Sequence, residues 1–325
     1  GIIIIVVLAV FFSSDCDVLL RFLPYSEKEA RSSFEGKVVW ITGASSGIGA
    51  QLARDYASAG AQVVLSARRV DQLESVARDC ANVGPQPIVH PLDVTDDDAQ
   101  AVVFERIMEQ SGHIDILVLN AGRSQRALAM ATDITDTRSL FELNVMAYIS
   151  LARLVVPSML KRGSGDVVVV SSIAGKLTTP VSSSYSASKY ALQGYFDTLR
   201  SEVYAEGVGV LLVCPGPVKS EIVENAMRGD TSGLSGSQVY KQDDQIMSTE
   251  RCTHLINKAL HYKFDEVWMA DQPFLAITYL SEYAPWFTRQ LMKNFIGPSR
   301  KRAFLEGASV FDVKLMLKQM FLGEK

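Results

Sequence analysis

The sequence is poor in the residues that build metal centres and disulfide frameworks. Only four cysteines and four histidines occur among 325 residues, and no two cysteines form a C-x-x-C pair. Neither a zinc site nor a disulfide-stabilised small domain is therefore indicated. Excess positive charge is lacking too, because 32 lysines and arginines stand against 36 acidic residues. We therefore expect no nucleic-acid partner.

Long hydrophobic runs are also scarce, with one exception at the start of the chain. Residues 1–12, GIIIIVVLAVFF, carry no charged side chain. A membrane-spanning helix needs about 20 apolar residues, so this run alone is too short. Two alternatives stay open: a buried strand, or the remnant of a membrane anchor or signal segment. We favour the second, because the run lies well before the first clear element of the domain.

Short apolar runs alternate with longer helical patterns from Lys37 onward. The runs KVVWITG, AQVVLSA, PIVHPLDV, IDILVLNAG, DVVVVSS and VGVLLVCPG are interpreted as six strands, and EVWMA as a further one. Most are continuous in valine, isoleucine and leucine, which is typical of parallel strands covered on both faces. Helices are predicted over 47–59, 70–82, 96–111, 136–162, 184–206 and 249–262. This alternation predicts an α/β fold: a single Rossmann-like domain with a doubly wound parallel sheet of about seven strands.

The segment TGASSGIG, residues 42–49, lies between the first predicted strand and helix and fits two catalytic patterns. Gly43, Ser45 and Gly47 match G-x-S-x-G, the turn that presents the nucleophile of serine hydrolases. A glycine-rich turn before a helix is also typical of dinucleotide sites, where helix N–H groups face the pyrophosphate. In that second interpretation, Ser45 donates a hydrogen bond to phosphate.

The hydrolase alternative has weak support elsewhere in the chain. It needs an acidic residue and then a histidine, in that order, after the serine. His254 and His261 lie late enough, but Asp265 follows them, and no HGGG-type segment occurs. Ser45 also lies in the first strand-to-helix turn, which is early for a nucleophile. We therefore favour the dinucleotide site.

The residues that follow the second predicted strand indicate which dinucleotide is bound. They read SARR and stand about 20 residues after the glycines, where such sites recognise the ribose. An acidic residue there would bind the 2′-hydroxyl of NAD. Arg68 and Arg69 instead suit the additional phosphate of NADP, through charge-assisted hydrogen bonds. The sequence therefore predicts NADP(H) as the cofactor.

Tyr185 and Lys189 stand four positions apart in a helical pattern, which places them on one helix face. Ser172 closes the fifth predicted strand, so all three can reach the carboxyl edge of the sheet, where α/β sites form. A phenol has a pKa of about 10, and a nearby ammonium group lowers it. A serine hydroxyl can hold a substrate oxygen as charge develops on it. The pattern predicts proton transfer by Tyr185, with Ser172 and Tyr185 in contact with the substrate.

These motifs together resemble the classical short-chain dehydrogenase/reductase family. The signs are TGASSGIG, LDV, LNAG, FELN, the SS pair that ends at Ser172, YSASK and PGPV, in this order across residues 37–270. The resemblance implies a catalytic tetrad of Asn144, Ser172, Tyr185 and Lys189. Tyr185 would give and take the proton, and Lys189 would hold the nicotinamide ribose and lower the pKa of Tyr185. Asn144 would anchor a water that relays protons.

The same resemblance implies the residues that contact the cofactor. Asp93 would meet the adenine, Asn120 would support the cofactor-binding backbone, and Val218 with its neighbours would touch the carboxamide. The full set comprises Gly43, Ser45, Ser46, Gly47, Ile48, Gly49, Arg68, Arg69, Asp93, Val94, Asn120, Ala121, Gly122, Tyr185, Lys189, Pro215, Gly216 and Val218.

Three further segments, SARRVDQLESV, PGPVKSEIVEN and QPFLAITYL, resemble a membrane-bound group within this family. That group resembles hydroxysteroid dehydrogenases and retinal reductases of the endoplasmic reticulum, which implies a lipophilic carbonyl or alcohol as substrate. We expect three parts: an anchor or signal remnant and linker at 1–33, the NADP-binding oxidoreductase domain at 34–270, and a C-terminal extension at 271–325 for which membrane association is one interpretation. A homodimer is left open.

Two hypotheses about function are compatible with the glycine-rich loop. An oxidoreductase needs both the glycine-rich loop and the tetrad, whereas a non-enzymatic NADP-binding scaffold or sensor needs the loop alone. The intact tetrad favours the enzyme. Residues 228–245, rich in glycine, serine and aspartate, are expected to form a mobile loop or lid.

Overall fold

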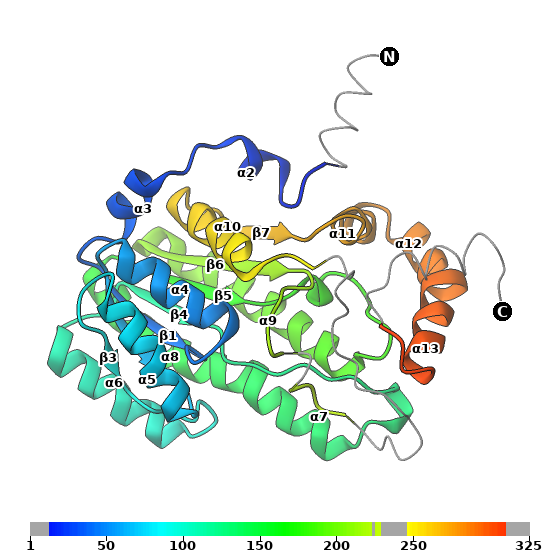
Figure 1. The fold of residues 1–325 in the computed structure, drawn as a ribbon, viewed down its shortest axis with the longest axis horizontal. Coiled ribbons are helices and arrows are strands. Elements are labelled where there is room, and N and C mark those ends of the chain that lie inside the picture. The colour runs from blue at the N-terminus through cyan, green and yellow to red at the C-terminus, as the bar shows by residue number, and fades with distance from the viewer. Residues whose placement is uncertain (1–12, 223–224, 229–245, 310–325) are drawn as a thin grey trace.

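The computed structural model describes residues 13–222, 225–228 and 246–309 and places a parallel sheet at the centre of the molecule (Figure 1). Its seven strands follow the order β3-β2-β1-β4-β5-β6-β7, and every neighbouring pair is parallel. The doubly wound sheet predicted from the alternating runs is therefore confirmed. The strands are β1 (Val38–Thr42), β2 (Gln62–Ser66), β3 (Ile88–Val89), β4 (Ile116–Leu119), β5 (Gly165–Val170), β6 (Val208–Pro215) and β7 (Glu266–Met269).

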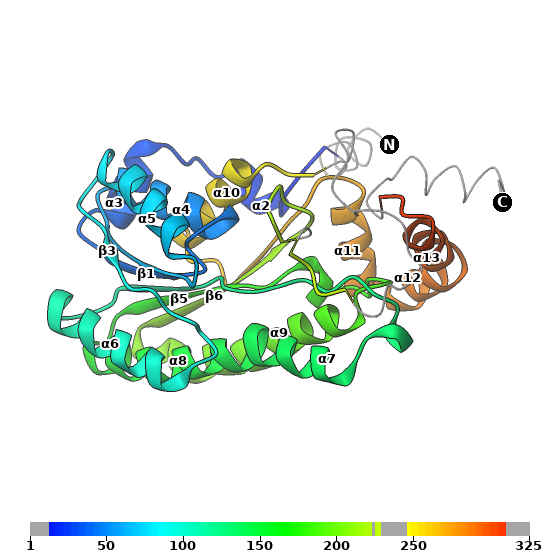
Figure 2. The same ribbon diagram turned by 60° about the horizontal axis from the view of Figure 1, so that its bottom comes forward.

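Helices cover both faces of the sheet, as the continuous apolar strands require. Figure 2 shows α6, α8 and α9 on one side of the sheet, with α4, α5 and α10 on the other. One side carries α6 (Asp97–Ser111), α8 (Ala147–Arg162) and α9 (Ser183–Val203). The other side carries α4 (Gly47–Ser58), α5 (Val70–Ala81) and α10 (Thr249–His261).

Each face of the sheet has its own hydrophobic core, because successive strand residues point to opposite sides. In β1, Ile41 packs into the core under α4, α5 and α10, whereas Trp40 packs into the core under α6, α8 and α9. Both side chains are fully buried. The two cores hold the carboxyl ends of the strands, and the turns that follow them, in fixed positions.

Two predicted elements differ from the structure. The run PIVHPLDV forms only the two-residue strand β3, because Pro91 has no N–H to donate and β3 lies at the edge of the sheet. The helix predicted over 136–162 begins earlier, as α7 (Ile134–Phe141), and continues through a π-helical turn, η2 (Glu142–Met146), into α8. That turn carries Asn144, and π-helical turns often occur at functional sites.

One helical stretch in the described residues, 134–162, is long and apolar enough to cross a membrane by length and composition. Half of its most apolar window is buried inside the protein. It comprises α7, η2 and α8, and α8 packs against β4, β5 and β6. We therefore assign it to the core. The apolar run at 1–12 and, apart from residue 228, the loop or lid expected at 228–245 lie outside the described residues.

The segments that flank the sheet also pack on it. Cys16 and Leu20 of the N-terminal segment are fully buried in the core under α10. The last described helices, α11, α12 and α13, gather at the end of the molecule to which the arrow of β7 points (Figure 1). The remaining helices are α2 (Val18–Phe22), α3 (Glu27–Phe34), α11 (Phe274–Tyr283), α12 (Pro285–Leu291), the π-helical η5 (Met292–Ile296), α13 (Gly297–Leu305) and the 3-10 turns η1 (Ala129–Ala131), η3 (Ile173–Gly175) and η4 (Tyr204–Glu206).

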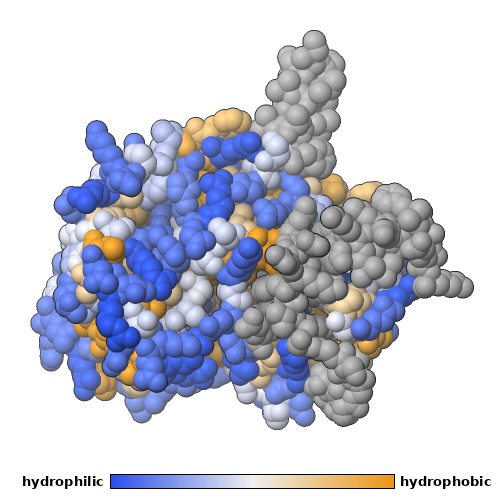
Figure 3. Space-filling view, viewed as in Figure 1, coloured by the Kyte–Doolittle hydropathy of each residue, from blue (hydrophilic) through white to orange (hydrophobic). Residues whose placement is uncertain are grey.

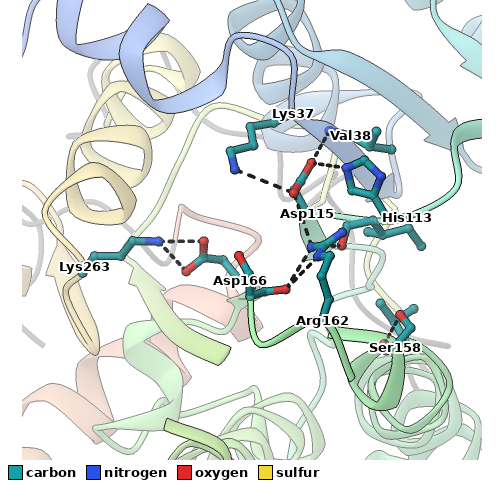
Figure 4. A network of polar contacts seen from close by, with 11 residues as sticks. Lys37, Val38, His113, Asp115, Ser158, Arg162, Asp166 and Lys263 are labelled. Carbon is teal, nitrogen blue, oxygen red and sulfur yellow. Dashed lines mark hydrogen bonds and ion pairs between the residues drawn. The ribbon is translucent and has the colours of Figure 1, made fainter. Parts of the chain in front are cut away.

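The amino ends of the strands, called the amino edge of the sheet, carry a network of charges around Asp115 (Figure 4). The Asp115 carboxylate accepts a hydrogen bond of 2.8 Å from the Val38 N–H and lies 3.1 Å from His113 Nε2. Arg162 and Lys37 form ion pairs with it at 3.3 and 3.7 Å. One carboxylate thus joins the starts of β1 and β4 to the end of α8.

A second pair lies beside this network. Lys263 Nζ donates to both carboxylate oxygens of Asp166, at 2.7 and 2.8 Å, and so joins the start of β5 to the segment before β7. A cavity of about 240 Å³ lies among these groups and is also lined by His261.

Candidate active site

A cavity of about 510 Å³ lies at the carboxyl edge of the sheet. Its lining comes from the segments that follow all seven strands, together with α9 and α13. This is where parallel α/β sheets place their ligand sites, because the strand-to-helix turns all open there.

The glycine-rich loop forms one end of the cavity. Gly43 and Gly47 have positive φ angles of 66° and 55°, which disfavour residues with a side chain. A Cβ atom on Gly49 would lie 2.4 Å from the Gly43 carbonyl oxygen, so α4 can approach the loop this closely only with glycine there. The Asn120 side chain donates to the carbonyls of Thr42 and Gly43, at 3.1 and 3.2 Å. The loop is therefore held open in front of the N-terminus of α4, which suits a pyrophosphate.

Arg68 and Arg69 line the same end of the cavity. The Arg69 guanidinium donates to the Ser46 hydroxyl at 2.6 Å and to the Ser45 hydroxyl at 3.3 Å. It also pairs with Glu221 at 2.7 Å, and Arg68 lies 3.6 Å from Asp93. Two exposed arginines are thus grouped with the loop hydroxyls, in a position suited to binding a phosphate group.

The Asp93 side chain forms hydrogen bonds within the turn to which it belongs. Its carboxylate accepts hydrogen bonds from the N–H and the hydroxyl of Thr95, at 3.1 and 2.9 Å. Partial burial acts to raise the pKa of Asp93, but these bonds and the charge of Arg68 outweigh it and lower the pKa. The remaining predicted cofactor residues that line the cavity are Ile48, Val94, Ala121, Gly122, Pro215, Gly216 and Val218.

Tyr185 and Ser172 lie together at the other end of the cavity. Ser172 ends the segment after β5, where its hydroxyl accepts from the Ala174 N–H at 3.1 Å and donates to the Pro215 carbonyl at 3.3 Å. Burial raises the pKa of Tyr185 above its usual value, while a hydrogen bond with Ser172 and the charge of Arg126 act to lower it. At neutral pH the phenol is therefore protonated.

Lys189 lies one helical turn after Tyr185 and is 4% exposed. Its Nζ donates to the Val170 carbonyl at 2.8 Å and lies 5.8 Å from the centre of the Tyr185 ring. Burial lowers the pKa of Lys189 to about 7. Burial raises the pKa of Tyr185, and burial of Lys189 also disfavours the ammonium form that would stabilise a phenolate. The expected lowering of the Tyr185 pKa by Lys189 stays a prediction.

Asn144 and Gly49 are the two predicted site residues that are not among the described lining of the cavity. The Asn144 side chain accepts from the Arg123 N–H at 3.0 Å and donates to the Arg123 carbonyl at 2.9 Å. It also donates to the Ser188 hydroxyl at 3.1 Å. Asn144 thus ties the segment after β4 to α9, next to Tyr185. Its expected role as the anchor of a water stays a prediction.

The structure adds residues that sequence reasoning missed. Leu177, Ile222 and Phe274 give the substrate end of the cavity an apolar wall, and Arg126 and Arg300 bring two guanidinium groups to it. None belongs to a short recognisable motif. Arg300 comes from α13, far along the chain from Tyr185, so only the folded arrangement brings it to the site.

The hydrolase alternative has no support in this geometry. All four histidines are described, and none lines the cavity that contains Ser45. His261 lies instead 2.6 Å from the Ser33 hydroxyl, next to the second cavity. Ser45 therefore has no histidine that could act as its base.

Comparisons with known proteins agree with the architecture and the motifs. Residues 37–230 match a family model described as short chain dehydrogenase. The chain is 40% identical over 298 residues to dehydrogenase/reductase SDR family member 7 of Homo sapiens, which covers 88% of this chain and 86% of that protein. It is similar to the structure of a short-chain dehydrogenase from Streptomyces avermitilis, at 30% identity and a TM-score of 0.68, over 79% of this chain and 95% of that one. It is also similar to a metagenomic short-chain oxidoreductase in complex with NADP, at 28% identity and a TM-score of 0.59, over 73% and 97%.

Proposed function

The chain belongs to the short-chain dehydrogenase family, and we propose that it transfers a hydride between NADP(H) and a lipophilic carbonyl or alcohol, such as a steroid or retinoid. The observation that carries the proposal is a single cavity that joins the glycine-rich loop to Ser172, Tyr185 and Lys189. Loop and proton-transfer groups in one cavity favour an oxidoreductase over a scaffold that only binds the dinucleotide.

The preference for NADP(H) is supported by charge at the ribose end of the cavity. Arg69 lies beside the loop hydroxyls and Arg68 beside Asp93, and guanidinium groups bind phosphate through paired, charge-assisted hydrogen bonds. Arg69 would exchange its contact with Glu221 for the phosphate when the cofactor binds. The metagenomic relative was determined in complex with NADP, which agrees with this proposal.

The proton chemistry is assigned to Tyr185. The bound nicotinamide ring would supply or accept the hydride. Ser172 would hold the substrate oxygen, and the protonated Tyr185 phenol would donate to that oxygen during reduction. Lys189 would bind the nicotinamide ribose, and Asn144 would position α9 and anchor the water expected there. A raised pKa keeps Tyr185 in its acid form, which favours reduction at neutral pH.

A lipophilic substrate and a membrane location are supported by apolar surfaces. Leu177, Ile222 and Phe274 line the substrate end of the cavity. Figure 3 shows apolar side chains gathered over α2, where Leu19 and Phe22 are exposed. We propose attachment to the endoplasmic reticulum membrane through the N-terminal segment 1–33, a catalytic domain at 34–270 and a membrane-associated extension at 271–325. A homodimer is part of the same proposal.

The test is turnover by Tyr185→Phe against a panel of steroid and retinoid carbonyls, followed by NADPH absorbance and product detection. We expect a loss of about 10²–10⁴-fold in kcat, because the variant cannot transfer the proton. Binding of NADPH should stay within about twofold of the original protein, since the phenol oxygen is not part of the phosphate cradle. Tyr190→Phe, an exposed position on the same helix, is the matched control. Substantial turnover by Tyr185→Phe would contradict the mechanism, and no turnover by the original protein would favour the scaffold.

A further inference from the structure

The segment that follows β6 contributes to both ends of the cavity. Glu221 lines the cofactor end, where its carboxylate pairs with Arg69. The next residue, Ile222, also lines the cavity and packs against the apolar cluster that contains Phe274 at the substrate end. Two adjacent side chains of one segment therefore belong to the two halves of the site.

This segment lies close to the glycine-rich loop. A Cβ atom on Gly47 would lie 3.1 Å from the Ser220 Cβ, so the backbone before α4 passes directly beside the residue that precedes Glu221. The Lys219 N–H donates to the Met247 carbonyl at 3.0 Å, which fastens the segment on its N-terminal side. The Glu221 side chain extends from this fastened point to Arg69 and is 43% exposed.

The Arg69 guanidinium uses its two terminal nitrogens for different acceptors. Nη1 donates to the Glu221 carboxylate at 2.7 Å. Nη2 donates to the Ser46 hydroxyl at 2.6 Å and to the Ser45 hydroxyl at 3.3 Å. A phosphate binds a guanidinium most strongly through two parallel N–H donors, and a carboxylate at one of them also repels it. A 2′-phosphate at Arg69 therefore competes with Glu221.

Asp93, the other acid in the described lining, is held differently. It lies 3.6 Å from Arg68, but its carboxylate also accepts two hydrogen bonds from Thr95. Those bonds keep Asp93 in place whatever Arg68 contacts. The partner that the structure shows for the Glu221 carboxylate is Arg69 itself, so a ligand that takes Arg69 frees Glu221.

We propose that Glu221 determines how strongly the protein distinguishes NADP(H) from NAD(H), and that it couples this choice to the substrate end. The inference rests on the proposed function. A bound 2′-phosphate displaces the carboxylate from Arg69 and thereby releases the segment that carries Ile222. NAD(H) has a hydroxyl group in place of the phosphate and leaves the contact intact. Glu221 thus weakens the binding of NADP(H) selectively, and the substrate end responds to the phosphorylated cofactor alone.

The first measurement compares adenosine 2′,5′-bisphosphate with AMP, because the two differ only in the 2′-phosphate. By calorimetric titration, Glu221→Gln should bind the bisphosphate about fivefold more tightly than the original protein, the upper effect of an exposed ion pair. Its affinity for AMP should change less than about twofold. Glu74→Gln, which removes an exposed carboxylate from α5, is the matched control for net charge. An unchanged bisphosphate affinity in Glu221→Gln, or an equal gain in Glu74→Gln, would overturn the inference.

A double-mutant cycle assigns the gain to the contact between the two side chains. In the Arg69→Ala background, Glu221→Gln should lose most of its effect on bisphosphate affinity, because the pair is already broken. A full gain in that background would mean that Glu221 acts without Arg69, which contradicts competition for the guanidinium.

Hydrogen exchange tests the link to the substrate end. The bisphosphate has no nicotinamide that could contact Val218, so a change that it causes in residues 216–222 originates at the phosphate. We expect faster exchange in a peptide over these residues with saturating bisphosphate than with AMP, and in Glu221→Gln without any ligand. Equal exchange with both ligands would overturn the coupling.

None of these measurements needs turnover, so the inference and the proposed function can fail separately. A preference for the bisphosphate that increases in Glu221→Gln, in a protein that reduces no carbonyl, would overturn only the proposed reaction. Turnover with NADPH together with an unchanged bisphosphate affinity in Glu221→Gln would overturn only the role of Glu221.

Discussion

The two edges of the sheet use charged residues in opposite ways. At the amino edge, Asp115 is surrounded by Lys37 and Arg162 at 3.7 and 3.3 Å, and Asp166 is paired with Lys263. At the carboxyl edge, Lys189 and Arg300 are buried in the cavity wall, and burial lowers the pKa of both. Paired charges fasten strand ends to helices, whereas buried groups with shifted pKa values are typical of sites that bind and transform ligands.

The difference has an energetic meaning. Burying a charged group costs free energy that only an opposite charge or hydrogen bonds can offset. The amino edge meets this cost within the protein. At the carboxyl edge, Lys189 lines the cavity and its Nζ donates to the neutral Val170 carbonyl. Substitutions at the two edges should therefore affect different properties.

The largest effect on ligand binding is expected where the carboxyl edge would bind phosphate. Replacing both Arg68→Ala and Arg69→Ala should weaken NADPH binding by about 100-fold and NADH binding by far less, because two charge-assisted contacts to the 2′-phosphate are lost. Fluorescence titration of each nucleotide measures the dissociation constants. Arg54→Ala is the control, because Arg54 pairs with Asp79 on the surface of α4 and α5. Equal losses for NADPH and NADH would contradict the cofactor assignment.

A smaller effect, on stability rather than ligand binding, is expected at the amino edge. Asp115→Asn removes the charge that Lys37 and Arg162 face, and the Asp115 side chain is only 12% exposed. We expect the free energy of unfolding to fall by about 2 kcal/mol, somewhat below the value for a fully buried pair. Chemical denaturation measures the loss, and kcat/KM of the folded protein should change less than about twofold.

The control for this substitution is Asp79→Asn. Asp79 pairs with Arg54 at 2.8 Å, but its side chain is 47% exposed. Exposed pairs contribute only about 0–1 kcal/mol, so this loss should be clearly smaller. If Asp115→Asn altered turnover as strongly as stability, the contrast between the two edges would fail.

Most of the fold could be predicted from the sequence, because it rests on local patterns. Continuous apolar strands and intervening amphipathic helices report burial directly, and all seven strands were expected. The short length of β3 could not be predicted, because the sequence does not show that Pro91 follows the strand at the edge of the sheet. The π-helical turn at Asn144 could not be predicted, because no residue type in Glu142–Met146 distinguishes it from a regular helical turn.

The two ends of the candidate site also differ in how far they could be predicted from the sequence. The cofactor end consists of contiguous motifs in strand-to-helix turns, so Gly43, Arg68 and Asn120 could be placed from their sequence positions. The substrate end joins Arg126 to Arg300, and only the packing of α13 on the segment after β5 brings these residues together. The protonation of Tyr185 was also beyond the sequence, because it depends on the depth of burial, which spacing alone does not report.

The smallest effect expected over a single pH unit is a change in how stability depends on pH. Burial lowers the pKa of Lys189 from 10.5 to about 7, so between these values the unfolded chain binds a proton that the folded protein lacks. The free energy of unfolding should therefore rise with pH across this window, by at most about 1.4 kcal/mol per pH unit. Lys189→Met should remove this rise, whereas Lys161→Met, an exposed lysine at the end of α8, should keep it. Denaturation of the cofactor-free protein at several pH values from 7 upward measures the slope. An unchanged slope in Lys189→Met would mean that the ammonium form is retained on folding, and that the carboxyl edge holds this charge as firmly as the amino edge holds its own.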